Sequence, residues 1–478
     1  MAPSRGAANP LGGAARPAYQ HPMWLLVITA CTSSAPKAGS GPVLDSDASS
    51  DSAPDSAPAA QDSSPLESVP GSTAAPDTDA LCQLALTCDV LPTRDTKVPC
   101  TLRVANVDGR VDWDGPAEVW VRGRSSSSVA KPGYGVELHD AAGDPVSADL
   151  LGMGGESDWV IDGLYYDRLL VRDKLGYDLF RSWHPDDWTA ESALCELTRN
   201  GEYFGVHALV ERVKRDDDRI DIADGATTGD SFVLTQIDED CFYPNRSTYG
   251  CWKLVSPDDG DLTPDGEAAL RAWLTAWEDE VLAVDAGADP SGLWNYLDMD
   301  NTVDTILLEE LFKNEDAFYT SMHLWKDAGG TVHYVPWDLD MTFGQFPYYP
   351  YGDYGNPEVW IDYRPTLWSV LAKDPAFNAR LAERWAELRA DSLAEEALYA
   401  EIDRLQGILG DAIDRNVARW PIETINYGGW FYEVTSYEDE DAHVRAWVAT
   451  RLAWMDANVA AWGGGARGPA RRGHAQDR

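Results

Sequence analysis

The stretch Ile306–Gly344 constrains this chain more than any other, because it encodes a helix, a hairpin and flanking carboxylates in close succession. Apolar residues at helical spacing predict a helix over residues 306–312. Two alternating segments, 322–326 and 331–337, predict strands, and the Gly329-Gly330 pair between them supplies the positive φ that a tight turn needs. The sequence therefore predicts that acidic residues on either side of the hairpin return to one place in the fold.

Three carboxylates flank this hairpin. Asp316 precedes it, and we expect Asp338 and Asp340 to alternate out of the end of its second strand. Like charges that converge repel one another, and a divalent cation is the usual remedy. The order of helix, Asn314, Asp316, hairpin and Asp-x-Asp follows protein kinases, in which one Asp orients the acceptor hydroxyl while an Asn and another Asp hold magnesium. The HRD and DFG signatures are absent, and the alternative is a capped turn with two solvated carboxylates.

Charge narrows the choice of partners. The 478-residue chain has a formal net charge of −42, from 38 basic and 80 acidic side chains. A surface that acidic repels nucleic acid and anionic lipid, so we expect neither as a partner. A nucleotide is also anionic, so a nucleotide site here must be locally basic, built from a few placed Lys and Arg side chains and metal ions.

A basic, serine-rich loop offers such a site. The segment 97–127 alternates apolar and polar residues around a turn, which predicts paired strands that end at Arg122-Gly123-Arg124 and four serines. Small residues let backbone N–H groups approach a phosphate closely. Lys131 stands just before a predicted strand and is a candidate to reach an α- or β-phosphate. The alternatives are an ordinary serine loop and a surface lysine.

The N-terminal segment indicates export. The apolar run 23–30 has the length of a signal-peptide h-region and is too short to span a bilayer. It ends at Cys31 in a sequence that resembles a bacterial lipobox, although a chance apolar patch is the alternative. Residues 32–80 are rich in Ser, Ala, Pro and Asp and predict a disordered tether. We expect one folded domain over 81–462 and a disordered basic tail over 463–478.

Cysteine content agrees with export. Six cysteines remain besides Cys31, and an even number fits up to three disulfides in an oxidising compartment. Cys241 and Cys251 flank a predicted turn and are a candidate pair, but six cysteines allow 15 connectivities. No clustered Cys/His spacing indicates a zinc site.

Other segments predict helices with a structural role. We expect a helix over 167–181 in which Arg172 forms a structural ion pair, and helices over 376–409, 411–420 and 442–462. The Asp298–Asp304 segment loosely mimics a calcium loop. Val303 stands where an EF-hand needs Gly, so we expect Asp298 or Asp300 to cap a helix instead.

Five blocks, taken together, resemble the CotH kinase family of atypical secreted protein kinases, also called spore coat protein H-like. They are VWVRGRSSSSVAKPGYGVEL (119–138), the DW…D…R block (150–181), LTRNGEYFGVHALVERV (197–213), ELFKNED (310–316) and PWDLDMTFG (336–344). The chain departs from the family at Asp173, where an Asn is usual.

The resemblance implies an α+β, protein-kinase-like bilobal fold, with an N-terminal β-rich lobe and a mainly helical C-terminal lobe. It implies ATP and Mg²⁺ or Mn²⁺ as cofactors. The implied roles are acceptor orientation by Asp316, metal binding by Asp338, Asp340 and Asn314, phosphate binding by Lys131, Arg122 and Arg124, and lining of the nucleotide cleft by Glu211.

We therefore expect a metal-dependent kinase that transfers the γ-phosphate of ATP to Ser or Thr of an extracytoplasmic protein. We expect a monomer, held to a bacterial membrane only by an N-terminal lipid anchor. The alternative is a catalytically inactive, kinase-like envelope lipoprotein that acts in binding or assembly. A calcium- or carbohydrate-binding module is a third hypothesis, but most of the 20 Trp residues stand at apolar spacing, which favours core packing.

Overall fold

The computed structural model describes residues 77–463, except 95, 238–240, 249, 259, 315, 319, 347–354 and 362–365. All described residues belong to one compact unit, Pro70–Arg478. The predicted lipobox, nearly all of the tether and the basic tail lie outside them. Among the helices that are described, none combines the length and apolarity that crossing a bilayer requires.

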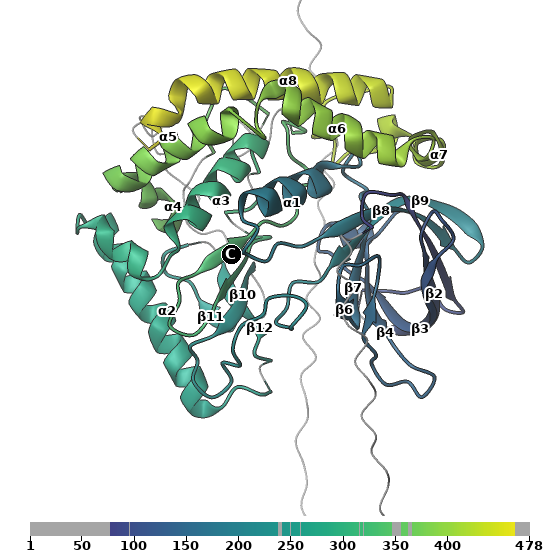
Figure 1. Cartoon of the computed structure of the whole chain (residues 1–478), viewed down its shortest axis with the longest axis horizontal. Helices are drawn as coiled ribbons and strands as arrows, with labels where there is room; N and C mark the ends of the chain where they lie inside the picture. The colour runs from purple at the N-terminus through teal and green to yellow at the C-terminus, as the bar shows by residue number, and fades with distance from the viewer. Residues whose placement is uncertain are drawn as a thin grey trace, which may run out of the picture. The chain divides into compact units, whose positions relative to one another are not determined.

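A closed seven-stranded barrel forms the N-terminal part of this unit, with the strand order β1-β2-β3-β4-β7-β9-β8 (Figure 1). Alternating apolar side chains, such as Leu102 and Val136, fill its interior. A tight turn joins β8 and β9, with Asn200 at φ 50° and Gly201 at φ 81°. The barrel strands are β1 (Cys82–Cys88), β2 (Val98–Ala105), β3 (Val111–Val121), β4 (Tyr134–Leu138), β7 (Asp158–Asp162), β8 (Ser192–Arg199) and β9 (Glu202–Glu211), and a separate pair is β5 (Ala148–Asp149) with β6 (Gly155–Glu156).

A second sheet, in the order β11-β12-β10-β13-β14, carries the predicted hairpin. The hairpin is β13–β14, with His323 opposite Val335 and Gly329 in its turn at φ 69°. The strands of this sheet are β10 (Phe232–Ile237), β11 (Tyr243–Pro244), β12 (Cys251–Ser256), β13 (His323–Lys326) and β14 (His333–Val335). The α+β class is therefore confirmed.

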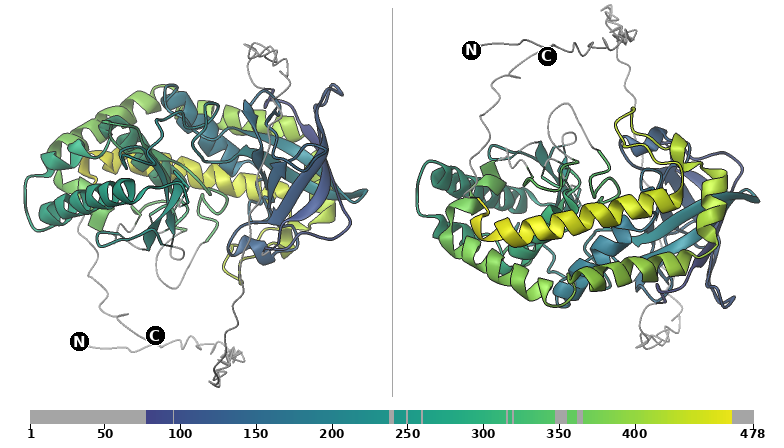
Figure 2. Two further views of the ribbon diagram at one scale, coloured as in Figure 1. Left: turned by 90° about the horizontal axis from the view of Figure 1, so that it is seen from below. Right: turned by 90° about the horizontal axis from the view of Figure 1, so that it is seen from above.

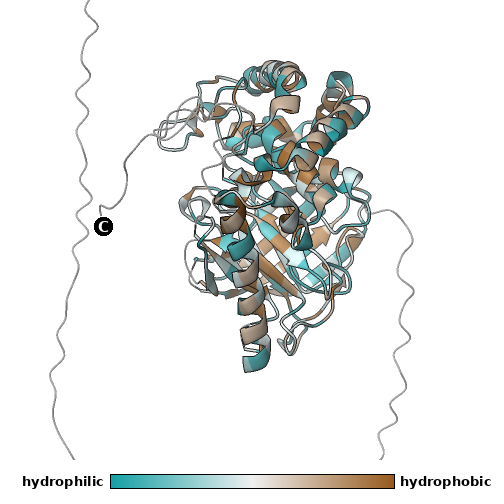
Figure 3. Cartoon of the chain, turned by 90° about the vertical axis from the view of Figure 1, so that its left-hand side faces the viewer, coloured by the Kyte–Doolittle hydropathy of each residue, from teal (hydrophilic) through white to brown (hydrophobic). Residues whose placement is uncertain are grey.

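Helices enclose the core around this second sheet. In Figures 1 and 2, α1 and α3 lie beneath the outer helices α5, α6 and α8. Figure 3 faces α2, where hydrophobic residues alternate with hydrophilic ones, and the buried Leu270, Leu274, Trp277 and Val281 follow helical spacing. The helices are α1 (Arg172–Trp183), α2 (Pro264–Asp285), α3 (Met299–Phe312), α4 (Thr366–Ser369), α5 (Pro375–Arg389), α6 (Glu395–Leu409), α7 (Ala412–Arg419) and α8 (Tyr437–Asn458).

Several helix boundaries differ from the sequence prediction, and two of the differences have a clear form. Helix α1 begins at Arg172 rather than 167, because Leu170 has a left-handed φ of 66° and Asp167 accepts the backbone N–H of Arg172 at 2.8 Å. The segment 376–409 is broken into α5 and α6 instead of forming one helix. The predicted cap is confirmed, since Asp298 accepts the N–H of Asn301 at 2.9 Å and begins α3.

Three disulfides pair the six cysteines of the folded unit. Cys82 joins Cys195 and Cys88 joins Cys100 within the barrel, and the predicted Cys241–Cys251 bond closes the loop before β12.

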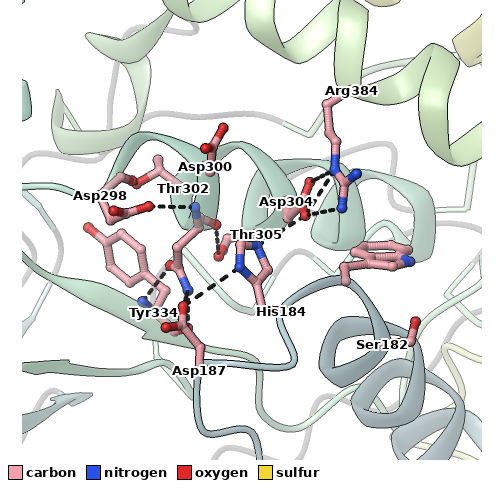
Figure 4. A network of polar contacts seen from close by, with 12 residues as sticks. Ser182, His184, Asp187, Asp298, Asp300, Thr302, Asp304, Thr305, Tyr334 and Arg384 are labelled. Atoms are coloured by element: carbon pink, nitrogen blue, oxygen red, sulfur yellow. Dashed lines mark hydrogen bonds and ion pairs between the residues drawn. The ribbon is translucent and has the colours of Figure 1, made fainter.

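Buried polar networks fix the helices. Arg172 pairs with Asp167 and with Glu440 of α8, each at 2.7 Å and with all three side chains fully buried, so its predicted structural ion pair is confirmed. Figure 4 shows a second network, in which His184 lies 3.0 Å from Asp304 of α3 while Arg384 of α5 binds the same carboxylate. These contacts hold α1 and α3 in place, and α3 directly precedes Asn314 and Asp316.

We expect Arg172→Ala to lower the free energy of unfolding by about 3–5 kcal/mol, because it leaves the buried Asp167 without its cation and Glu440 with Arg168 alone. Urea unfolding measures the change. The matched control is Arg380→Ala, which breaks an ion pair with the largely exposed Asp300 and removes at most about 1 kcal/mol. Equal losses in the two variants would contradict a stabilising role for the buried network.

Candidate functional site

A cavity of about 460 Å³ opens where loops of the barrel meet the segments around the hairpin. Its volume is in the range of small-molecule sites. The charged residues that line it are Arg122, Arg124, Lys131, Asp162, Asp316, Asp338 and Asp340. The structure therefore brings together six of the eight predicted site residues.

A smaller cavity of about 130 Å³ adjoins the first, and both are lined by Asp316 and Asp338. Asn314 lines this second cavity, and its side-chain amide lies 3.4 Å from the carbonyl oxygen of Asp338. Asp316 is exposed. Asn314 and Asp316 directly follow the left-handed Lys313, at φ 53°, which ends α3.

The geometry of Asp338 differs from the expected strand alternation. Strand β14 ends at Val335, and Asp338 has a left-handed φ of 63°. The Ser321 hydroxyl donates to the Asp338 carboxylate at 2.8 Å, and the Asp338 N–H donates to the Tyr177 hydroxyl at 3.3 Å. A turn held by these contacts, rather than an extended strand end, turns Asp338 toward the cavity.

Two further carboxylates increase the negative charge here. Asp162 ends β7 and lines the cavity, and Asp173 is a buried residue of α1 that accepts the Leu339 N–H at 2.6 Å. Burial, followed by Asp338, Asp173 and Asp162, raises the pKa of Asp340 well above its usual range. Burial also raises the pKa of Asp338, with a further contribution from Asp162.

Sequence reasoning missed Asp162 and Asp173 as contributors to this charge. The signal was present at Asp173, which replaces the Asn that is usual in the resembling family. No local pattern places Asp173 beside Leu339, 166 residues away. The contact arises only when α1 packs against the segment after β14.

The cationic side of the cavity comes from the barrel. Arg122 follows β3, and its guanidinium lies 5.5 Å from the Trp337 ring. No hydrogen bond joins that guanidinium to any described residue, so its donors are available to a ligand. Burial, with repulsion from Arg212, lowers the pKa of Arg122 against the attraction of Asp162. This arrangement suits an anion.

Lys131 lies on the same side, with only 1% of its surface exposed. Its ammonium donates to the Val206 carbonyl at 2.8 Å and to Asn416 Oδ1 at 3.2 Å. Burial lowers its pKa to about 7, against the opposing influence of Asp167 and Asp162. The lysine is thus a buried group of the cavity wall rather than a surface residue.

The structure does not bring Glu211 to the cavity. Its carboxylate pairs with Arg219 at 2.8 Å and accepts the Glu191 N–H at 2.8 Å. Burial raises its pKa to about 7. The end of β9 therefore carries a structural ion pair where the sequence predicted a cleft residue.

A compact acidic cluster lies elsewhere. Among the residues that the structure describes, Glu118, Glu137 and His139 alone form a group close enough to enclose one ion. Lys97 lies 3.9 Å from Glu118 and also pairs with Glu137, so a cation is already present there. The cavity carboxylates are more widely spread, which fits a magnesium ion held by one or two carboxylates together with phosphate oxygens.

Comparison with protein families agrees with this geometry. The family described as CotH kinase protein matches residues 119–455. The chain belongs to the CotH kinase family. The match begins in β3, ends in α8 and includes every cavity residue named above. Membership indicates a kinase-like function, with ATP and a divalent metal as cofactors. No curated protein matches the chain.

We expect Asp340→Asn to stabilise the metal-free protein at pH 8 by about 1–2 kcal/mol. A carboxyl whose folded pKa is raised keeps a proton that the unfolded chain has released, so its contribution to stability falls as the pH rises above about 4. The neutral amide removes this loss. Urea unfolding at pH 5 and pH 8 measures it.

The control is Asp391→Asn, which alters an exposed carboxylate between α5 and α6. We expect it to change stability by less than about 0.5 kcal/mol at either pH. Destabilisation by Asp340→Asn at pH 8 would contradict the repulsion described above.

Proposed function

We propose that this chain is a protein kinase that transfers the γ-phosphate of ATP to a Ser or Thr hydroxyl of an extracytoplasmic protein. One observation carries the proposal. A single cavity is lined by Arg122 and Lys131 from the barrel and by Asp316, Asp338 and Asp340 from the segments that flank the hairpin. Phosphoryl transfer needs both, because cations neutralise the phosphates while carboxylates hold metal and orient the acceptor.

Each residue has a distinct role in this proposal. Arg122 and Lys131, with Arg124, bind the phosphates, and Asp338 with Asp340 and Asn314 holds the metal. A bound Mg²⁺ or Mn²⁺ supplies charge neutralisation at the transferring phosphoryl group. Asp316 accepts a hydrogen bond from the acceptor hydroxyl and aligns it with the phosphorus. Its exposure supports an acceptor presented on another protein.

We further propose that the domain acts outside the cytoplasm. We also propose that its barrel and its helical part form the bilobal arrangement of a protein kinase. Three disulfides support an oxidising compartment. Cys31 and the tether would anchor the domain to a bacterial membrane by lipid alone, as a monomer.

A second candidate is a nucleotide-binding shell without turnover. Lys131 has neutral hydrogen-bond partners, Val206 and Asn416, where a typical kinase lysine has a Glu. Such a shell would bind ATP with metal and be stabilised thermally, but would transfer no phosphate.

The test is incorporation of label from γ-labelled ATP into the protein itself and into dephosphorylated casein, with Mg²⁺ or Mn²⁺. We expect Asp338→Ala to reduce transfer at least about 100-fold, because the principal metal ligand is lost. We expect Asp316→Asn to reduce kcat by a similar factor while nucleotide binding persists.

The matched control is Asp391→Ala, whose exposed carboxylate is remote from the cavity segments in sequence, and we expect wild-type rates from it. Thermal stabilisation by ATP and metal without label transfer would favour the inactive shell. Transfer that survives Asp338→Ala would contradict the assigned metal site.

A further inference from the structure

Helix α7 follows α6 in the helical half of the chain, yet it docks on the barrel. Figure 1 shows α7 beside β8 and β9. Arg415 forms two hydrogen bonds with Glu196 of β8, at 2.8 and 2.9 Å. Just after the helix, the Trp420 indole donates to the Phe204 carbonyl of β9 at 2.8 Å. The helix is therefore attached to the barrel on both sides of Asn416.

Asn416 occupies the centre of this contact and is 3% exposed. Its Oδ1 accepts the Val206 N–H at 3.0 Å and the Lys131 ammonium at 3.2 Å. Lys131 also donates to the Val206 carbonyl at 2.8 Å. Gly205 permits the close approach, because a Cβ there would lie 2.7 Å from Asn416 Oδ1. One amide oxygen thus joins α7, strand β9 and the lysine of the cavity wall.

Both hydrogen-bond partners of this lysine are neutral. The charged groups that face it are Asp162 at the end of β7 and Asp167 in the loop before α1, and both act without a hydrogen bond to it. His207 of β9 is the titratable neighbour on the other side, and burial, reinforced by Lys131, lowers its pKa well below the usual range. The charge of Lys131 is therefore not cancelled by a bonded carboxylate.

We propose that Asn416 is a positioning residue for phosphate binding: it holds the Lys131 ammonium at the cavity wall without neutralising the charge that the nucleotide would meet. This inference rests on the proposed function, in which Lys131 contacts phosphate. Asn416 itself does not line the cavity as described and acts through the lysine. A carboxylate at this position would hold the ammonium equally well but would neutralise it.

The first test compares affinity for a non-hydrolysable ATP analogue with Mg²⁺ at pH 6.5 and pH 8.5, in the wild type, Asn416→Asp, Asn416→Ala and Arg415→Ala. In the wild type we expect affinity to fall about tenfold at the higher pH, as Lys131 loses its proton. In Asn416→Asp the new carboxylate keeps Lys131 protonated but neutralises its charge. We therefore expect an affinity below that of the wild type at pH 6.5, and a change of less than about threefold between pH 6.5 and pH 8.5. We expect Asn416→Ala to bind the analogue at least about fivefold more weakly than the wild type at pH 6.5.

Arg415→Ala is the matched control, because it weakens the docking of α7 without removing the oxygen that Lys131 contacts. We expect its affinity to stay within about twofold of the wild type. Equal losses in Asn416→Ala and Arg415→Ala would overturn the inference, since helix docking alone would explain both. An unchanged pH profile in Asn416→Asp would also overturn it.

The second test needs no nucleotide. Urea unfolding is measured between pH 7 and pH 9 for the wild type and for Asn416→Asp, and each is compared with the variant that also carries Lys131→Met. The native wild type releases the lysine proton near pH 7 while the unfolded chain keeps it. The free energy of unfolding of the wild type, minus that of Lys131→Met, must therefore rise with pH across this range. Asn416→Asp must flatten the rise. If the wild type binds no nucleotide, the proposed function fails, and this comparison still decides whether Asn416 controls Lys131.

Discussion

The repulsion among buried carboxylates is the constraint on which the rest of this structure depends. Asp162, Asp173, Asp338 and Asp340 come from three separate parts of the chain, and the negative charge of Asp162 helps to raise the pKa values of the other three. Hydrophobic packing of α1 and the hairpin brings them together although they repel. Such an arrangement persists only when packing in the rest of the fold offsets the repulsion. Arrangements of this kind cluster at functional sites.

Two parts of the scaffold supply the charges of the cavity, and the barrel also contributes the carboxylate of Asp162. The cations Arg122 and Lys131 are carried by loops of the disulfide-linked barrel. The carboxylates Asp316, Asp338 and Asp340 follow α3 or β14, which are fixed by the second sheet and the helices around it. Helix α7 crosses between these parts and bonds to Lys131 through Asn416. Charges of both signs, from these two parts of the chain, therefore line one cavity.

The sequence predicted the local features of this site well, because each has a local cause. Gly329 and Asn200-Gly201 specify tight turns, Asp298 specifies a helix start, and the order of Asp316, hairpin and Asp338 specifies their return to one cavity. Some failures are local, such as the turn at Asp338 that replaces a strand end, but the contacts that the sequence missed are non-local. The neighbours of Lys131 and Asp173 lie 285 and 166 residues away. Glu211 stands at the end of a strand, as a cleft residue would, but its carboxylate pairs with Arg219 and does not line the cavity.

The central claim is that these two sets of charges together bind a metal–nucleotide complex. A crystal structure of the full chain with Mg²⁺ and a non-hydrolysable ATP analogue tests it most directly. The account predicts polyphosphate oxygens within hydrogen-bond distance of Arg122 and Lys131, with the metal bridging them to Asp338. A nucleotide bound outside this cavity, or inside it with its phosphates turned away from both cations, would contradict the account.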